Sequence, residues 1–247
     1  MNTSKQIKVW LIQNVIAPYR EPLFRKIAEA EDVDFSLILT SDSYKSRPQW
    51  KKDSSEYSFK VVTIPGFVVR RSHDWETCVN PSLLLKAVRE RPDVVICGGY
   101  EISSLLILLY KLLFGGRYLI WTESTLHTEK CVSRVKTWLR KLMVKNSSCF
   151  VDAGKLSRDY VKSLMPGGAR KKFFRSYNCI DVDLFKTSES RRNPFAGRNL
   201  PGKKILFVGR IDERKGVPQL LEAYKLLTEK DPNTTLLMVG EGPLEEM

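Results

Sequence analysis

Apolar positions along the chain fall into short continuous runs that alternate with segments of helical spacing. Runs of strand length occur at 8–13, 33–39, 59–64, 93–97, 118–121 and 149–151. Apolar residues recur at helical spacing over about 22–30, 81–90, 102–114, 132–145 and 159–164. Strands that are apolar throughout are typical of sheets buried on both faces. The pattern therefore predicts an α/β fold, a parallel sheet with helices on both faces.

The alternation stops in a stretch of turn-forming and charged residues. Residues 186–202 carry Ser, Arg, Asn, Pro and Gly with little periodicity, which predicts a linker between a domain at 1–185 and a second domain beginning at 203. A strand at 203–208, a helix from 217 and a strand ending at 239 cannot bury a core alone. We therefore expect the second domain, 203–247, to be incomplete in this sequence.

Composition narrows the class of protein. A hydrophobic content of 43% makes disorder improbable, and a formal charge of +13 predicts an anionic partner: a nucleotide, anionic lipid headgroups or nucleic acid. The five cysteines are scattered, which predicts reduced thiols in a cytoplasmic protein. The start of the chain does not resemble a signal peptide. The longest apolar run, 102–114, is interrupted by Lys111 and predicts a buried helix, since it is too short to span a bilayer.

The predicted helix at 132–145 combines an apolar stripe with many cations. The stripe comprises Val135, Trp138, Leu139, Leu142 and Met143. The cations are Lys130, Arg134, Lys136, Arg140, Lys141 and Lys145. Such a stripe is more often core than membrane-facing, yet the cationic remainder fits a helix that rests on anionic lipid. Both interpretations stay open, and the second predicts a peripheral protein at the cytoplasmic face of a membrane.

The segment 207–216 has the features of a phosphate site. It joins the strand at 203–208 to the helix from 217 and contains Gly209, Arg210 and Lys215. A glycine allows close approach of the backbone, the helix N-terminus offers unpaired N–H groups, and the cations supply charge, which together suit a diphosphate. The alternative is an ordinary loop whose basic residues are solvated.

Further candidates follow the strands of the first domain, because ligands of open α/β sheets bind beyond the carboxyl ends of the strands. They are Pro18, Tyr19 and Arg20; Gly98 and Gly99; and Glu123 and His127. A glutamate and a histidine at such a place can bind sugar hydroxyls or help in proton transfer. The alternatives are a loop fixed by Pro18, a tight glycine turn and a surface histidine.

Two further motifs do not indicate a phosphate-binding or metal-binding site. The run 197–203 fits Gly-x4-Gly-Lys, but Lys204 follows it and it precedes a strand, so it is not a phosphate-binding P-loop. The pair Asp181 and Asp183 precedes the linker, and only two histidines occur, so no metal is expected.

The strand, loop and helix at 205–223 contain the pattern Phe-Val-Gly-Arg, four residues, Lys-Gly and then Leu-Leu-Glu-Ala. This stretch resembles the start of the second domain of retaining glycosyltransferases of the GT-B type, family 4 (glycosyltransferase group 1). The run Leu-Leu-Met-Val-Gly-Glu-Gly-Pro at 236–243 is similar to the next strand and loop of that family. The resemblance begins near Ile7 and implies two Rossmann-like domains, the second truncated here.

The resemblance implies roles for these residues. Arg210 and Lys215 would hold the diphosphate of a UDP- or GDP-linked sugar, and Gly240 and Gly242 would form a donor loop. The segment 18–20 would line the acceptor cleft, and 121–124 resembles the Trp-x-Glu-Ser stretch of some members. His127 resembles a histidine that contacts the donor sugar. The segment 178–185 resembles Asn-Gly-Val-Asp-x-x-x-Phe, with Cys179 in the usual glycine place; we interpret Asn178 and Asp181 as backbone-capping groups.

The implied function is retaining transfer of a hexose from a nucleotide-diphosphate sugar to a polysaccharide or lipid-linked acceptor. The cations would stabilise the leaving diphosphate, so no metal or other cofactor is expected. With part of the donor pocket missing, these 247 residues alone should be a poor catalyst. The alternatives are a non-catalytic basic module that binds nucleic acid or anionic membranes, and another Rossmann enzyme such as a dehydrogenase. No nucleic-acid motif is present, so nucleic acid is not expected as a partner.

Overall fold

The chain forms two compact units, Met1–Lys186 and Thr187–Met247. The computed structural model describes residues 5–41, 50, 53–72, 75–183, 197 and 200–245. Most of the predicted linker at 186–202, half of the stretch 44–59 and Phe185 lie outside these residues.

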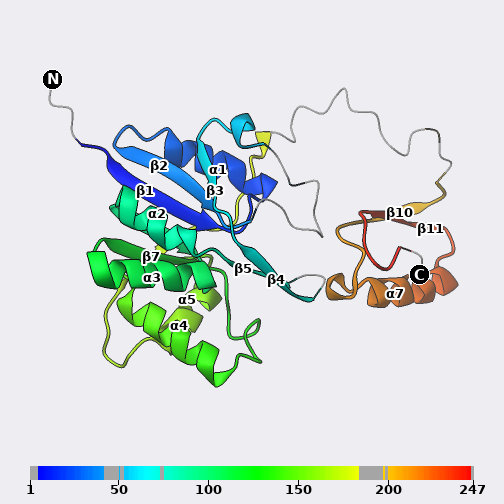
Figure 1. Cartoon of the computed structure of the whole chain (residues 1–247). Helices are drawn as coiled ribbons and strands as arrows, with labels where there is room; N and C mark the ends of the chain where they lie inside the picture. The colour runs from blue at the N-terminus through cyan, green and yellow to red at the C-terminus, as the bar shows by residue number, and fades with distance from the viewer. Residues whose placement is uncertain are drawn as a thin grey trace. The chain divides into compact units, whose positions relative to one another are not determined.

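A parallel sheet of seven strands organises the first unit, in the order β3-β2-β1-β6-β7-β8-β9 (Figure 1). Its strands are β1 (Ile7–Gln13), β2 (Val33–Leu39), β3 (Lys60–Thr63), β6 (Val94–Gly98), β7 (Arg117–Thr122), β8 (Cys149–Asp152) and β9 (Lys172–Arg175). The helices between them are α1 (Glu21–Ala28), α2 (Ser82–Glu90), α3 (Ile102–Phe114), α4 (Arg134–Asn146) and α5 (Lys155–Leu164). This α/β arrangement of strands and covering helices is Rossmann-like and confirms the predicted fold class.

Side chains of β1 alternate between two cores, one on each face of the sheet. Trp10 and Ile12 belong to a core that α2, α3, α4 and α5 cover, and Leu11 belongs to a second core that contains Phe24 of α1. Trp10 and Phe24 are fully buried. The two-sided burial explains why the strands are apolar at successive positions instead of alternating with polar residues.

The order of the strands reverses at β1. The chain passes from β1 to β2 and β3 on one side, and then returns to β6 on the other side of β1. The connections after β1 and β6 therefore diverge, and α/β proteins commonly bind ligands at such a point. The loops that follow Gln13 and Gly98 lie at this point.

Some elements of the first unit differ from the sequence prediction. A hairpin of β4 (Phe67–Ser72) and β5 (Trp75–Val79), and the edge strand β9, were not predicted. The helix α3 was predicted to be buried, but its last turns expose Leu109, Leu112, Leu113 and Phe114. Buried residues of α3 extend to Tyr110, so only the outer face and the last turn are exposed, which corrects that prediction. No helix in the described ranges combines the length and apolar character that a bilayer crossing requires.

The second unit contains a two-stranded parallel sheet of β10 (Lys203–Val208) and β11 (Thr234–Val239), with α7 (Val217–Lys230) between them in the chain (Figure 1). The strand β10 was predicted to be buried, but Leu206 and Val208 are 59% and 69% exposed. Two strands and one helix cover only one face of such a sheet, so the apolar side chains of the other face stay accessible among the residues that the structure describes.

Candidate functional site

Arg20 gathers a group of polar side chains at the carboxyl edge of the first unit's sheet. It ends the short 3-10 helix η1 (Pro18–Arg20), directly after β1. Its guanidinium forms an ion pair with Glu123 and donates a hydrogen bond of 3.1 Å to Oδ1 of Asn178. It also lies over the ring of Trp121, 5.1 Å from its centroid. Residues from three distant parts of the chain therefore meet at one guanidinium.

Gln13 completes this cluster and explains the glycine at the end of β6. A Cβ atom on Gly98 would lie 2.7 Å from Nε2 of Gln13, so the glycine makes room for the glutamine side chain. Oε1 of Gln13 lies 3.5 Å from the Arg20 guanidinium. Nε2 of Gln13 and Nε of Arg20 are buried without a hydrogen-bond partner among the described residues. Buried donors of this kind are normally satisfied, so these two are exceptions among the described residues.

Several residues predicted from separate strand ends thus lie together. Arg20 and Glu123 are in contact, and the ring of Tyr19 lies 5.9 Å from the Arg20 guanidinium. Gly99 adopts a positive φ of 91° and donates its N–H to the carbonyl of Trp121 at 2.8 Å, which fixes the turn after β6. The sequence analysis missed Gln13, although a polar residue at the end of an apolar strand is a signal for such a site.

Asn178 has a different role from the predicted one. It was interpreted as a backbone-capping group, but its side-chain oxygen accepts from Arg20 instead. Asp181 does cap the backbone, since its Oδ1 accepts the N–H of Asp183 at 3.1 Å, as predicted. Sequence spacing identified the turn but could not show that a guanidinium 158 positions away lies beside Asn178.

His127 stands apart from this cluster. It lies exposed in a turn over 126–130, and no hydrogen bond or ion pair of its ring is found within the described part of the chain. The same turn is held by hydrogen bonds between Thr125 and Thr128. The predicted pairing of Glu123 and His127 in one catalytic site therefore has no contact to support it.

The predicted phosphate segment of the second unit forms a tight loop around Asp212. This aspartate is 6% exposed, and its Oδ1 accepts the backbone N–H of Lys215 at 3.0 Å. Its Oδ2 lies 3.3 Å from Nε of Arg210 and 3.8 Å from Arg214. The loop closes with Gly216, whose φ of 71° is left-handed and precedes α7. Asp212, which the sequence analysis did not select, therefore fixes both the loop and the Arg210 side chain.

Lys215 differs from its neighbour Arg210. Its side chain is exposed, and its ammonium has no hydrogen bond or ion pair among the described residues. It lies at the start of α7, where the first N–H groups of a helix lack internal partners and the helix dipole favours an anion. The lysine and the helix end are thus suited to the same negatively charged ligand.

Gly240 and Gly242 allow the loop after β11 to pack on the phosphate segment. A Cβ on Gly240 would lie 1.9 Å from the carbonyl oxygen of Gly209, and one on Gly242 would lie 2.2 Å from that of Ile211. Hydrogen bonds join the two segments, from Ile211 to Glu241 at 3.1 Å and from Leu244 to Ile211 at 3.2 Å. Both glycines are therefore needed for close backbone contact beside Arg210.

The cationic helix α4 presents an apolar surface outside this cluster. The sequence left both core packing and membrane contact open for the stripe, and Val135 and Trp138 are 67% and 61% exposed. Met143 is buried, so part of the stripe faces the core and part of it is exposed. Arg134, Lys141 and Lys145 are exposed on the same side as Trp138 by helical spacing. The described residues contain no group of three or more metal-binding side chains.

Comparison with known proteins places this geometry in context. Residues 190–247 match the family model described as glycosyl transferases group 1. The chain is 38% identical over 71 residues to the phosphatidyl-myo-inositol mannosyltransferase of Mycobacterium tuberculosis, a match that covers 28% of this chain and 18% of that relative. It is 27% identical over 179 residues to the glycogen synthase of the same organism, covering 72% of this chain and 36% of that enzyme. The chain thus spans well under half of either relative.

Solved structures share the fold at low sequence identity. HepE from Anabaena in complex with UDP and glucose matches with a TM-score of 0.64 and 15% identity, covering 98% of this chain and 63% of that one. A UDP-N-acetylglucosamine 2-epimerase matches with a TM-score of 0.62 and 12% identity, covering 94% of this chain and 63% of that one. The fold by itself does not separate transferases from epimerases. Residues 190–247 are thus similar to the glycosyl transferases group 1 family, and the solved structures show the fold alone.

Proposed function

We propose that this chain acts in the retaining transfer of a hexose from a nucleotide-diphosphate sugar to a polysaccharide or lipid-linked acceptor. The observation that carries the proposal is Lys215, an unpaired cation among the described residues, at the N-terminus of α7. It lies within the segment 190–247 that matches the glycosyl transferases group 1 model. An anionic group with more than one phosphate suits this site, because Arg210 lies in the same loop.

The proposed chemistry uses the cations of the second unit. The bond between the anomeric carbon and the diphosphate oxygen breaks, and an acceptor hydroxyl forms the new bond at that carbon. The hydroxyl proton leaves with the diphosphate or passes to solvent. Negative charge grows on the diphosphate as the bond breaks, and fixed cations with a helix N-terminus lower the barrier. No metal is required for this step in the proposal.

The donor is tested by binding, which does not require turnover. Isothermal titration of the 247-residue chain with UDP-glucose and GDP-mannose, with EDTA present, measures affinity for each nucleotide without metal. Lys215→Ala should weaken the better donor by about tenfold, since one charge-assisted contact at an exposed site is lost. Lys204→Ala is the matched control: it removes an exposed lysine from the opposite end of β10 and should leave affinity unchanged.

Lys215 is a sharper test position than Arg210. Arg210 pairs with Asp212, so its removal also releases the carboxylate that holds the loop. If neither nucleotide sugar binds, or if Lys215→Ala and Lys204→Ala behave alike, the proposed donor site is wrong. Retention is tested separately, by the anomeric coupling in the proton NMR spectrum of the product of the complete enzyme.

A second proposal, compatible with the first, is that α4 rests on an anionic membrane at its cytoplasmic face. The specific observation is that Trp138 and Val135 are exposed beside Arg134, Lys141 and Lys145. Trp and cations together favour the interface of anionic lipids. The chain should sediment with vesicles containing phosphatidylglycerol and not with pure phosphatidylcholine, and Trp138→Ala should reduce this several-fold. Equal retention by RNA at the same salt would instead favour a general polyanion-binding module.

A further inference from the structure

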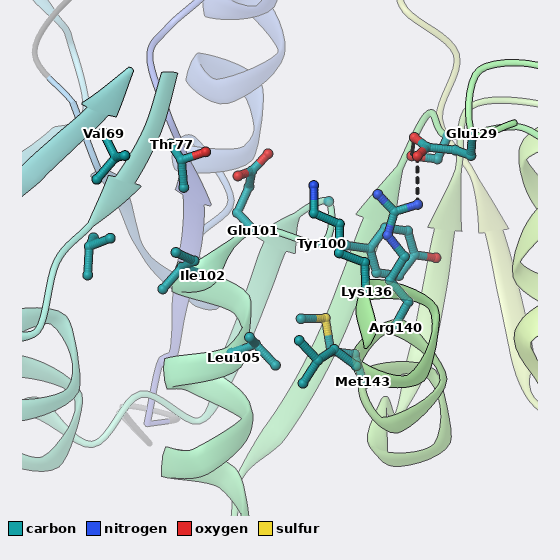
Figure 2. Close-up of a pocket in the computed structure, with 14 residues that line it drawn as sticks. Val69, Thr77, Tyr100, Glu101, Ile102, Leu105, Glu129, Lys136, Arg140 and Met143 are labelled. Carbon is teal, nitrogen blue, oxygen red and sulfur yellow. Dashed lines mark hydrogen bonds and ion pairs between the residues drawn. The ribbon is translucent and has the colours of Figure 1, made fainter. Parts of the chain in front are cut away.

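A cavity of about 370 Å³ lies in the first unit between the β4–β5 hairpin, the start of α3 and α4 (Figure 2). Its volume falls in the range of small-molecule pockets, roughly 300–1,000 Å³. Gly99, Tyr100 and Glu101 contribute from the turn after β6, and α4 contributes residues spaced along one face. Among the residues predicted for catalysis and for donor or acceptor binding, only Gly99 lines it, and the predicted membrane helix adds Lys136, Leu139, Arg140 and Met143.

One end of the cavity is polar and balanced in charge. Glu101 and Lys136 point toward the same end in Figure 2, where Arg140 is joined to Glu129. The Arg140–Glu129 distance is 2.7 Å, and the Arg140 guanidinium lies 5.1 Å from the centroid of the Tyr100 ring. Arg140 also donates to the hydroxyl of Tyr160, so its position is fixed from three sides. Two carboxylates and two cations therefore face a ligand at this end.

The opposite end is apolar. Leu105 of α3 and Met143 of α4 lie there in Figure 2. Val79, Ile102 and Leu139 add further apolar side chains to the lining. A ligand that fills the whole cavity must therefore combine a polar group with an apolar one.

We propose that this cavity binds a neutral polyhydroxylated group joined to an apolar substituent, and that it is the acceptor site. Each sugar hydroxyl both donates and accepts hydrogen bonds, so it can use a carboxylate and a cation at once. A phosphate or carboxylate would instead meet the Glu101 and Glu129 carboxylates, and the paired charges leave no excess of cations to offset that repulsion. The balanced charges thus favour a polyol over an anion.

The position of the cavity in the first unit agrees with a role as the acceptor site. Gly99 and Ser124 line it, and they directly follow Gly98 and Glu123 of the Arg20 cluster. The cavity and the cluster are therefore neighbours along both β6 and β7. The acceptor role rests on the proposed sugar transfer, whereas the binding of an amphipathic polyol does not.

Glu101 supplies a second observation. Burial raises the pKa of its carboxyl, while Arg140 and Lys136 act in the opposite direction and Glu129 adds to the rise. The carboxyl can bond to a hydroxyl in either state, as an acceptor when ionised and as a donor when protonated. An anion, in contrast, would be held only by the protonated form.

The test uses three probes with the 247-residue chain at pH 7.5: n-octyl β-D-glucoside below its micelle-forming concentration, n-octyl phosphate with the same chain, and glucose without a chain. Titration calorimetry should show the glucoside binding at least about tenfold more tightly than either of the other two, since only it matches both ends of the cavity. Octyl phosphate binding as tightly as the glucoside would overturn the proposal in favour of an anion site. Absence of glucoside binding would overturn it outright.

Substitutions of residues that line the cavity test whether the probe binds there. Glu101→Ala should weaken glucoside binding about tenfold, and Glu101→Gln should restore most of it, because an amide oxygen still accepts from a hydroxyl. Leu105→Gln should weaken it through the apolar end, whereas Leu109→Gln should not, because Leu109 lies one turn further along α3, is 43% exposed and does not line the cavity. Circular dichroism and thermal unfolding show whether each variant folds, and the Glu101 pair keeps the test valid if Leu105→Gln does not.

Two further variants serve as controls. One distinguishes binding in the cavity from binding on the protein surface, and the other distinguishes failure of the cavity proposal from failure of the donor-site proposal. Trp138→Ala should leave glucoside affinity unchanged; a loss as large as that of Glu101→Ala would show that the probe binds the exposed face of α4 and would overturn the proposal. Lys215→Ala should weaken nucleotide-sugar binding only. If nucleotide sugar binds and the glucoside does not, the cavity proposal alone is wrong; the reverse result refutes the proposed donor site and leaves the polyol pocket in place.

Discussion

Arg20 in the first unit and Lys215 in the second are held in opposite ways. In the first unit the side chain of Arg20 is 14% exposed, and its guanidinium is shared among Glu123, Asn178 and the face of Trp121. In the second unit Lys215 is exposed, and its ammonium is unpaired among the described residues. A cation that is already paired mainly fixes the position of other groups, while an unpaired one can contribute affinity for an anion. Arg20 therefore positions other groups, whereas Lys215 can bind a ligand.

The two units also differ in how deeply their apolar side chains are buried. Leu37 in β2 is fully buried, whereas Leu206 in β10 is 59% exposed. The first unit can therefore hold the largely buried Arg20 in a fixed position, because two cores support its sheet. The second unit has no comparable core among its described residues, and a hydrogen-bonded loop fixes its site instead.

The largest expected difference is in the free energy of unfolding. Leu37→Ala should destabilise the first unit by about 2–5 kcal/mol, because it removes fully buried methyl groups and leaves a cavity. The matched change Leu206→Ala should cost less than about 1 kcal/mol, because its side chain is already largely in water. Urea titration followed by hydrogen exchange of peptides from each unit measures both values. Equal costs would mean that β10 is buried by something outside the described residues.

The next effect concerns glycines that make close contacts. Gly240→Ala would bring a Cβ to 1.9 Å from the backbone oxygen of Gly209, and its φ of 147° disfavours a side chain. We expect the loop to separate from the phosphate segment, with a loss of roughly 2–3 kcal/mol in local stability and at least about tenfold in nucleotide-sugar affinity.

Gly98→Ala is the counterpart in the first unit. Its Cβ would meet the end of the Gln13 side chain at 2.7 Å, and a side chain can move where a backbone oxygen cannot. The expected cost is near 1 kcal/mol, with donor affinity unchanged. Calorimetric titration and thermal unfolding of both variants test the contrast, which a larger effect on donor affinity from Gly98→Ala would contradict.

A smaller effect distinguishes the two cations directly. Arg20→Met should lower stability by about 1–2 kcal/mol, because Glu123 and Asn178 lose their common donor, and should leave nucleotide-sugar affinity within about twofold. Lys215→Met should do the reverse, with stability within about 0.5 kcal/mol. Thermal unfolding with and without the donor measures both quantities for each variant. If Arg20→Met weakens the donor as strongly as Lys215→Met, the division between positioning and binding does not hold.

The fold and the conformation of the loop at 207–216 could be predicted from sequence because both depend on short-range patterns. The apolar runs gave the strands of the central sheet, and the junction of β10 and α7 placed Arg210 and Lys215 in one loop. The Arg20 cluster could not be predicted as a unit, because Gln13, Glu123 and Asn178 come together only through the order of the strands. The exposed faces of α3 and β10 were missed for a related reason: periodicity shows which residues are apolar but not which neighbours cover them.

The smallest effect depends on pH and on Glu101 of the first unit. Burial raises the pKa of its carboxyl above the ordinary value of 4.5, so the folded state binds the proton more tightly than the unfolded state. The contribution of Glu101 to stability is therefore most favourable at low pH and falls as the pH rises from 4.5 through the raised folded pKa. Glu101→Gln removes this ionisation, so its stability relative to the original chain should increase across that interval, by less than about 1 kcal/mol at pH 7.

A charge change in the second unit provides the control for this pH effect. Glu213 is exposed in η5 (Glu213–Lys215), so Glu213→Gln should stay within about 0.5 kcal/mol of the original chain at each pH. Urea titrations at pH 4, 5.5 and 7 measure both differences. A Glu101→Gln difference that is constant over this range would show that the carboxyl is hydrated in the folded chain. The polar end of the cavity would then be open to water, and its selectivity for a polyol would have to come from Lys136 and the Arg140–Glu129 pair.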